Sequence, residues 1–256
     1  MVIMARPQKK PHYDAEKIMK ELMLAVAESY EGTGELKLTA TEFALSPIKI
    51  RKLLIIAQEK GFISEIYTNE IYEEVLSLYA AGKSLETIQE ITGLGKSSIN
   101  GYQPYLKYPY KPDELSTNAD RTALYRRRKE VVHNLVDILS KEKLWEAIIA
   151  FQDYPFHTAS GLAFSYTVKV GRDGTYNKEL IVDRRADSKS LAWSSIRMAF
   201  DNALELRGKI IKRPKMLGGI RGISYVYPML YRFGIIEVPT EIANQMIGKN
   251  PKMKKK

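Results

Sequence analysis

Apolar side chains recur every three or four residues through the N-terminal half of the chain, which is the spacing of one buried face of an α-helix. The pattern predicts helices over 14–29, 41–44, 47–60 and 69–79. Asp14 suits a helix start, and Pro47 takes the favoured first position of the third helix. Glycines and polar turns separate these helices, so we divide this half of the chain into two helical units, 14–66 and 67–104.

The segment Ser84–Tyr102 has the most informative pattern. The inward positions of its two short helices are Leu85, Ile88, Ile91 and Ile99. Gly93, between the two helices, supplies the positive φ that a tight interhelical turn requires. The second helix presents four polar side chains suited to phosphates and base edges: Lys96, Ser97, Ser98 and Asn100.

This segment resembles the repressor-type helix-turn-helix of DNA-binding proteins, in which an apolar residue, four intervening positions and a turn glycine recur in the same order. One departure is Gln89, which stands where that family usually has alanine. The resemblance implies a second helix that enters the major groove of duplex DNA. The alternative is an ordinary helical hairpin in an all-α core.

The first unit, 14–66, ends in a similar arrangement. Its last helix places Ile50, Leu53 and Leu54 inward. Three cations on that helix are largely outward: Lys49, Arg51 and Lys52. This looks like a more compact helix-turn-helix that contacts a neighbouring stretch of groove, and the alternative is a plain three-helix packing unit.

The helical pattern stops after Tyr102. The segment 105–118 combines prolines, lysines and tyrosines without helical or strand spacing, so we predict a linker. A helical connector is expected over 119–152, with one long helix reaching about Lys143. The connector carries a basic block that contacts phosphates or forms a solvated helix face: Arg126, Arg127, Arg128 and Lys129.

A β signal is confined to the C-terminal module, 153–246. Apolar and aromatic residues alternate over 161–170, a glycine-containing turn follows, and 178–185 completes a predicted hairpin. The next stretch predicts an amphipathic helix whose first turn places Arg197 beside hydroxyl side chains, a combination that grips phosphates.

The expected fold is therefore mainly α with a C-terminal α+β module: tandem helix-turn-helix units, long helices, a β-hairpin and a packed helix. The stretches HTASGLAFSYTVK and GISYVYPMLYRFG resemble uncharacterised, mobile-element-like proteins of anaerobic bacteria. That resemblance implies no known activity.

The charge of the chain favours a polyanionic partner. Its 256 residues carry a formal net charge of +10 and a pI of about 9.4, and both ends are basic, as an arm over 1–13 and a tail over 247–256. No apolar run approaches the roughly 18–20 residues that span a bilayer, so no membrane partner is expected. The chain has no cysteine, which excludes disulfides and cysteine-based metal sites and fits a cytoplasmic, nucleoid-associated protein.

No intact catalytic or cofactor motif is present, so we assign no catalytic residue, no metal site and no cofactor. The best group of carboxylates, Asp153, Asp173, Glu179 and Asp183, lacks the acid-x-Lys spacing of restriction-type nucleases. A site-specific endonuclease or recombination enzyme, with Asp153, Glu179 and Asp183 meeting around Mg²⁺, is the alternative. A third hypothesis is a structural protein whose helix-turn-helix units serve only packing.

The sequence thus predicts a sequence-specific, double-stranded DNA-binding protein, acting as a transcriptional regulator of bacterial, phage or mobile-element origin. The helix over 96–102 reads the major groove, and the cations named above anchor phosphates. Two readers in one chain permit an asymmetric site without dimerisation, and a homodimer is the other assembly considered.

Overall fold

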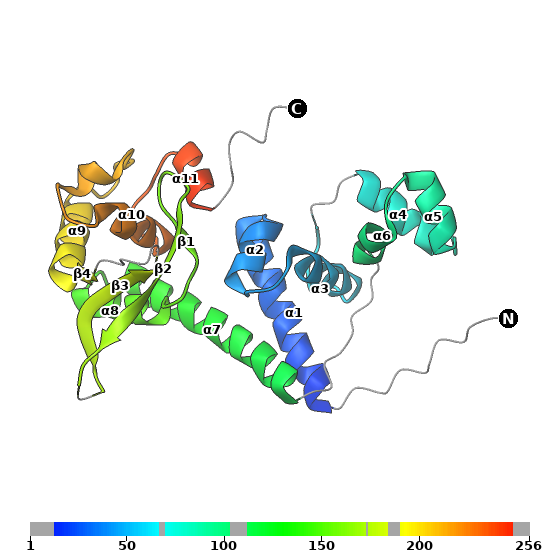
Figure 1. The fold of residues 1–256 in the computed structure, drawn as a ribbon, viewed down its shortest axis with the longest axis horizontal. Helices are drawn as coiled ribbons and strands as arrows, with labels where there is room; N and C mark the ends of the chain where they lie inside the picture. Colours follow the sequence, from blue (N-terminus) through cyan, green and yellow to red (C-terminus); the bar gives the residue numbers. More distant parts are fainter. Residues whose placement is uncertain (1–12, 67–69, 103–111, 173, 184–189, 248–256) are drawn as a thin grey trace. The chain divides into compact units, whose positions relative to one another are not determined.

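The structure is a computed structural model that describes 13–66, 70–102, 112–172, 174–183 and 190–247. The described residues form eleven α-helices, one short 3-10 helix and a four-stranded antiparallel sheet (Figure 1). The prediction of a mainly α chain with a C-terminal α+β module is confirmed. The chain divides into two compact units, Met1–Arg126 and Arg127–Lys256, and each is described by itself below.

Two predicted basic segments fall largely outside this description. The arm over 1–13 is described only at Tyr13, and the tail over 247–256 only at Ile247. Among the described helices, none combines the length and apolar character needed to cross a membrane.

The first unit opens with three helices around one apolar core: α1 (Tyr13–Thr33), α2 (Leu36–Glu42) and α3 (Pro47–Glu59). Its fully buried side chains include Leu22, Val26, Phe43, Ile50, Leu53 and Leu54. Ser46 caps α3, because its hydroxyl oxygen accepts a hydrogen bond from the Lys49 N–H at 3.3 Å.

The position predicted for the short second helix, 41–44, is wrong. The helix ends at Glu42, and Ala44 adopts a left-handed φ of 48°, which no continuing helix allows. The residues that do form α2 include threonines at two buried or half-buried positions, and these hide the apolar spacing that would reveal a helix.

Three more helices follow in the first unit: α4 (Glu70–Ala80), α5 (Leu85–Thr92) and α6 (Lys96–Tyr102). Val75, Ile88 and Ile99, one from each helix, form a small core of their own. Each of the three is fully buried. The predicted division of Ser84–Tyr102 into two short helices is therefore confirmed.

Helix α7 (Pro112–Asp137) begins earlier and ends earlier than predicted. It starts inside the expected linker, 105–118, where a proline at the first helical position and acidic residues in the first turn favour a helix start. The rest of that linker, up to 111, lies outside the described residues. The predicted continuation to Lys143 is also wrong, because Ser140 caps a separate helix, α8 (Lys141–Ala150), accepting from the Lys143 N–H at 3.2 Å.

The expected connector, 119–152, contributes to both units. Tyr125 on α7 packs in the apolar core of the first unit, with its ring centroid 4.9 Å from that of Phe43. Leu135, ten residues later on the same helix, is fully buried in the core of the second unit.

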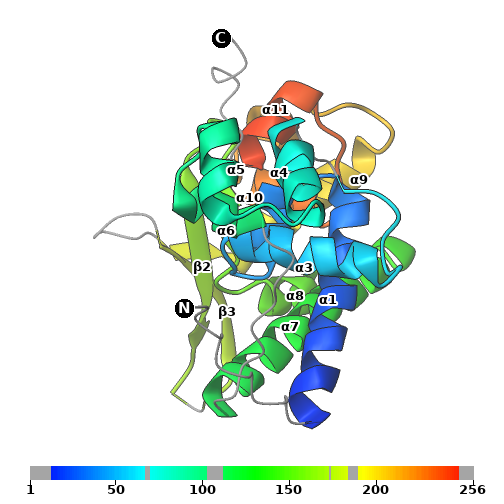
Figure 2. The same cartoon turned by 90° about the vertical axis from the view of Figure 1, so that its right-hand side faces the viewer.

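The second unit contains an antiparallel sheet in the order β1 (Phe156–His157), β2 (Ala163–Val170), β3 (Tyr176–Asp183) and β4 (Ser190–Ala192). The long hairpin of β2 and β3 was predicted and can be followed in Figure 1 and Figure 2. The outer strands were not predicted, since two or three residues are too few to show a period-2 pattern.

One face of the sheet is buried against helices. Phe164, Tyr166 and Val168 alternate along β2 as buried residues, and the Tyr166 hydroxyl donates a hydrogen bond to the Ile148 carbonyl of α8 at 2.8 Å. The same core includes side chains of α9 (Trp193–Glu205), the 3-10 helix η1 (Pro214–Leu217), α10 (Ile223–Arg232) and α11 (Thr240–Met246).

Candidate nucleic-acid interface

The turn between α5 and α6 has the local geometry of a helix-turn-helix. Ser84 caps α5 by accepting a hydrogen bond from the Thr87 N–H at 3.2 Å. Gly93 ends the helix in the left-handed region, with φ 66°, and its N–H donates to the Gln89 carbonyl at 2.9 Å. Only three residues, 93–95, join the two helices, which is the short glycine-containing turn typical of this motif.

The two helices are fixed by apolar contacts beneath the turn. Ile88 and Ile99 are fully buried, whereas Ile91, which we expected to face inward, is 51% exposed. Helix α5 ends one residue after Ile91, so this side chain lies at the edge of the packed face. Ile88 and Ile99 form, with Val75, the small core at which α6 packs against α4 and α5.

Burial along α6 separates inward from outward positions. Lys96, Ser97 and Ser98 are exposed, Ile99 is buried, and Asn100 is half-buried. The first three predicted contact residues thus share one accessible stretch at the start of the helix. Asn100 retains partial access next to it.

A carboxylate of α5 lies in the electrostatic field of this stretch. The pKa of Glu86 is lowered, chiefly by a hydrogen bond from its own backbone N–H and then by one from Ser84. The Lys96 ammonium adds a smaller effect in the same direction.

Helix α6 also packs against α3 within the first unit. The Arg51 guanidinium carbon lies 4.9 Å from the centre of the Tyr102 ring, a cation–π distance. A Cβ placed on Gly101 would meet the Ile48 Cγ2 at 3.6 Å, so the two helices are in ordinary van der Waals contact there. The predicted contact residues of α3 and α6 consequently belong to one compact unit.

The three predicted cations of α3 differ in their surroundings. Lys49 is exposed, whereas Arg51 and Lys52 are half-buried. The pKa of Lys49 is lowered, first by partial desolvation and then by the Arg121 guanidinium, while Glu114 acts in the opposite direction. A bound phosphate would reverse this shift, because an anion favours the protonated ammonium.

The basic block of α7 is divided between surface and core. Arg127 is exposed, and Arg126 makes a surface ion pair with Glu21 at 3.5 Å. Arg128 is only 4% exposed, so its predicted role as a phosphate contact is wrong. Its guanidinium instead donates hydrogen bonds to two backbone carbonyls, of Ala150 and Gln152, each at 3.1 Å.

The predicted contact residue of the C-terminal module, Arg197, is exposed on α9 of the second unit. It belongs to a different compact unit from Lys96 and the α3 cations.

The described carboxylates considered for metal binding, Asp153, Glu179 and Asp183, do not form a cluster, and Asp173 lies outside the described residues. Within the described part of the chain, no group of three histidine, cysteine, aspartate or glutamate side chains is close enough to hold a metal ion. Glu179 accepts a hydrogen bond from the Lys169 ammonium at 2.8 Å and forms an ion pair with it. Asp153 lies in a tight turn with φ 58°, and its N–H donates to the Tyr166 carbonyl.

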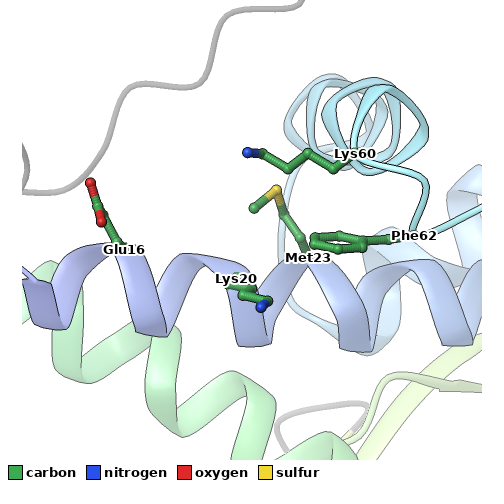
Figure 3. A pocket seen from close by; sticks show the side chains of 5 residues that line it. All are labelled: Glu16, Lys20, Met23, Lys60 and Phe62. Carbon is green, nitrogen blue, oxygen red and sulfur yellow. The ribbon is translucent and has the colours of Figure 1, made fainter.

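A surface hollow of about 480 Å³ lies on the first unit beside α1 (Figure 3). It is lined by Glu16, Lys20, Met23, Lys60 and Phe62. Lys20 lies over the Phe62 ring at 5.9 Å, and the charged side chains at the rim are exposed. The sequence analysis did not single out this hollow, whose residues come from two segments far apart in the chain.

Comparison of the chain with protein-family models, with curated proteins and with solved structures finds no match.

Proposed function

We propose that this protein binds duplex DNA and reads its sequence with α6. The observation that carries the proposal is the accessible start of α6, where Lys96, Ser97 and Ser98 project from a helix fixed by the buried Ile99 and by the three-residue turn after Gly93. A reading helix needs this combination, because base readout requires side chains held in a defined register.

The polar groups of α6 match the chemistry of the major groove. Serine hydroxyls donate to or accept from several base edges, and asparagine can make a bidentate pair with adenine. Lys96, next to these residues, suits a phosphate contact that sets the register of the helix but reads no base. Ser97, Ser98 and Asn100 are therefore the proposed readers.

Helix α3 supplies neighbouring phosphate contacts in this proposal. Lys49 is the exposed cation and Lys52 is half-buried, while Arg51, also half-buried, acts partly by fixing Tyr102 at the end of α6. Arg126 and Arg127 are further accessible cations. Their replacement should weaken binding without changing which sequence is preferred.

For the cellular role we propose transcriptional regulation on nucleoid DNA, by a protein of bacterial, phage or mobile-element origin. A protein bound at such a site can block other proteins from the DNA or recruit them to it, and neither effect requires a chemical step. A homodimer would present two copies of α6 to half-sites separated by about one helical turn of DNA, roughly 34 Å.

The test is selection from a random duplex library, using the full chain at moderate salt with Mg²⁺ and sequencing both bound and cleaved DNA. We expect an enriched, intact motif that is lost in the double variant Ser98→Ala/Asn100→Ala. A matched control, Ser64→Ala/Asn177→Ala, removes the same groups from exposed positions elsewhere and should preserve the motif. Enrichment that survives the α6 double variant, or no enrichment by the wild type, would refute reading by α6.

Cleaved ends at a fixed offset from an enriched motif would instead identify a site-specific nuclease. The selection therefore separates that alternative from the proposal in a single experiment.

A further inference from the structure

A strongly basic segment of the second unit, 207–221, was not singled out in the sequence analysis. Between Glu205 and Glu237 the chain has seven lysines and arginines and no aspartate or glutamate. Six of the seven cations lie in this segment and all six are exposed: Arg207, Lys209, Lys212, Arg213, Lys215 and Arg221. The seventh, Arg232, donates a hydrogen bond to the Tyr154 hydroxyl at 3.1 Å.

The backbone of the basic segment is anchored to the core of the second unit. Ile211 and Leu217 are buried at 1% and 0% exposure. The carbonyl of Ile211 accepts a hydrogen bond from the buried Tyr227 hydroxyl, and the carbonyl of Leu217 accepts one from the Asn202 side chain at 2.7 Å. The cations therefore lie on a turn whose backbone is fixed by these contacts. Binding of a ligand to them would cost little backbone entropy.

Within the described residues, none of the six cations makes an ion pair with an aspartate or glutamate, whereas Lys141 on α8 pairs with Asp201 at 3.0 Å. Glu237 lies beside the segment, since its carbonyl accepts a hydrogen bond from the Ile211 N–H at 2.8 Å, but its carboxylate pairs with none of them. Cations concentrated without partners repel one another, and a polyanion relieves that repulsion. The surface therefore favours a polyanionic ligand.

Helices α4 to α6 carry a net negative charge, in contrast to the basic segment. Residues 70–102 contain five glutamates and two lysines, so this part of the chain adds little general attraction to a phosphate backbone. If α6 reads bases, most of the sequence-independent affinity has to come from elsewhere in the chain.

We propose that the basic segment, 207–221, binds the phosphate backbone of duplex DNA. It supplies sequence-independent affinity, and α6 supplies sequence preference. This division of roles rests on the proposed function, but contact between the basic segment and phosphates can be measured whether or not α6 reads a sequence.

The apolar side chains in the segment do not suit a membrane surface. Ile210 and Met216 are exposed at 52% and 37%, but Met216 folds back so that its sulfur accepts a hydrogen bond from the Lys212 N–H at 3.3 Å. Helix η1 is only four residues long, and its Leu217 faces the core. An interfacial anchor needs a continuous apolar face, which this turn lacks.

The test measures how duplex binding by the full chain depends on salt. The triple variant Lys212→Gln/Arg213→Gln/Lys215→Gln removes three cations of the basic segment. The control Lys17→Gln/Lys37→Gln/Lys60→Gln removes three exposed cations from α1, α2 and the end of α3, so both variants have the same net charge. Fluorescence anisotropy with a 20-base-pair duplex of arbitrary sequence gives the dissociation constant at each salt concentration, and circular dichroism verifies that both variants fold.

Each neutralised phosphate contributes about 0.9 to the slope of log affinity against log salt. The segment variant should therefore lower the slope by roughly two to three units and weaken binding about a hundredfold at 0.1 M salt, equally for every sequence. The control should stay close to the wild type. Equal slopes and equal affinities for the two variants would overturn the proposal.

The two proposals fail in different ways. Loss of the enriched motif in Ser98→Ala/Asn100→Ala, with an unchanged salt slope, supports base reading by α6. The proposal for the basic segment is tested separately, by the salt slope of the segment variant. The assignment to DNA would be overturned if the wild type did not bind duplexes but bound vesicles of anionic lipid, and if the segment variant lost that binding. The basic segment would then be a membrane-binding surface.

Discussion

The Nε–H of Arg128 donates a hydrogen bond to the carbonyl oxygen of Ala150 at 3.1 Å, which places an arginine of α7 at the last residue of α8. A second hydrogen bond, from Nη2 to the Gln152 carbonyl, meets the chain just beyond that helix end. The guanidinium carbon also lies 5.1 Å from the centre of the Tyr154 ring. These contacts explain why this arginine is buried while Arg127, before it, is exposed.

Replacing Arg128 should destabilise the second unit. Arg128→Met keeps the length of the side chain but leaves backbone carbonyls at the end of α8 without these donors. We expect the free energy of unfolding to fall by about 2–4 kcal/mol. Chemical denaturation measures the loss, and Arg127→Met is the matched control, expected within about 0.5 kcal/mol of the wild type. Similar values for the two variants would contradict a structural role for Arg128.

A second prediction concerns the turn before α6. Gly93 has φ 66° and open space around its missing Cβ, so Gly93→Ala introduces backbone strain without a clash. The expected loss is about 1 kcal/mol of unfolding free energy. Gly95→Ala, two residues later, has the same open space and no positive φ, so its stability should hardly change. A loss of the same size in both variants would show that the left-handed conformation is not the cause.

A third prediction concerns the glycine that follows η1. At Gly218 an added Cβ would lie 2.9 Å from the Asn202 Nδ2, and φ is 106°. Gly218→Ala should therefore lower the thermal midpoint, with a cost of about 1–3 kcal/mol, and loosen the Asn202–Leu217 hydrogen bond beside the basic segment. Gly219→Ala, which meets nothing and has no positive φ, serves as the control. The expected order of stability is wild type, then Gly219→Ala close to it, then Gly218→Ala.

A fourth prediction is a pH effect at Tyr227. Burial, with a smaller effect of Tyr231, raises the pKa of Tyr227 from 10.0 to about 12. The folded state thus favours the neutral phenol, so this contribution to stability is complete below pH 10 and is lost as the pH rises through 12. A shift of two pKa units corresponds to roughly 2.7 kcal/mol of unfolding free energy without screening. Screening by solvent reduces the expected loss of stability to about 2 kcal/mol at most.

Tyr227→Phe removes that titration together with the hydrogen bond to the Ile211 carbonyl. At pH 7 the variant should be less stable by about 1 kcal/mol. Between pH 10 and 12 the gap should narrow, because only the wild type loses the contribution of this phenol. Urea denaturation across this range measures both effects, and parallel stability curves would count against a perturbed Tyr227.

The elements that sequence predicted well are those whose signal is local. Ile88, Gly93 and Ile99 lie within twelve residues, and their spacing alone predicts two helices joined by a tight turn. The β2–β3 hairpin was equally accessible, since alternating burial along each strand and the intervening turn are both properties of neighbouring residues.

One error arose where distant residues decide the outcome. The sequence does not distinguish the four cations of the basic block on α7 from one another. Arg128 is buried because it donates hydrogen bonds to carbonyls at the end of α8, which lie more than twenty residues away in the chain. The start of α7 was missed because prolines and tyrosines obscured a helix start that the acidic first turn would have indicated. The basic segment was missed for a different reason: its signal is a run without any acid, which a search for motifs does not register.

The basic segment has a consequence for proteolysis. Lys209, Lys212 and Lys215 are sites for trypsin, which must draw the chain into an extended conformation in order to cut it. The 3-10 helix and the buried anchors Ile211 and Leu217 oppose that extension. The rate at which trypsin nicks these bonds in the otherwise folded protein therefore reports how often this turn opens, independently of global unfolding.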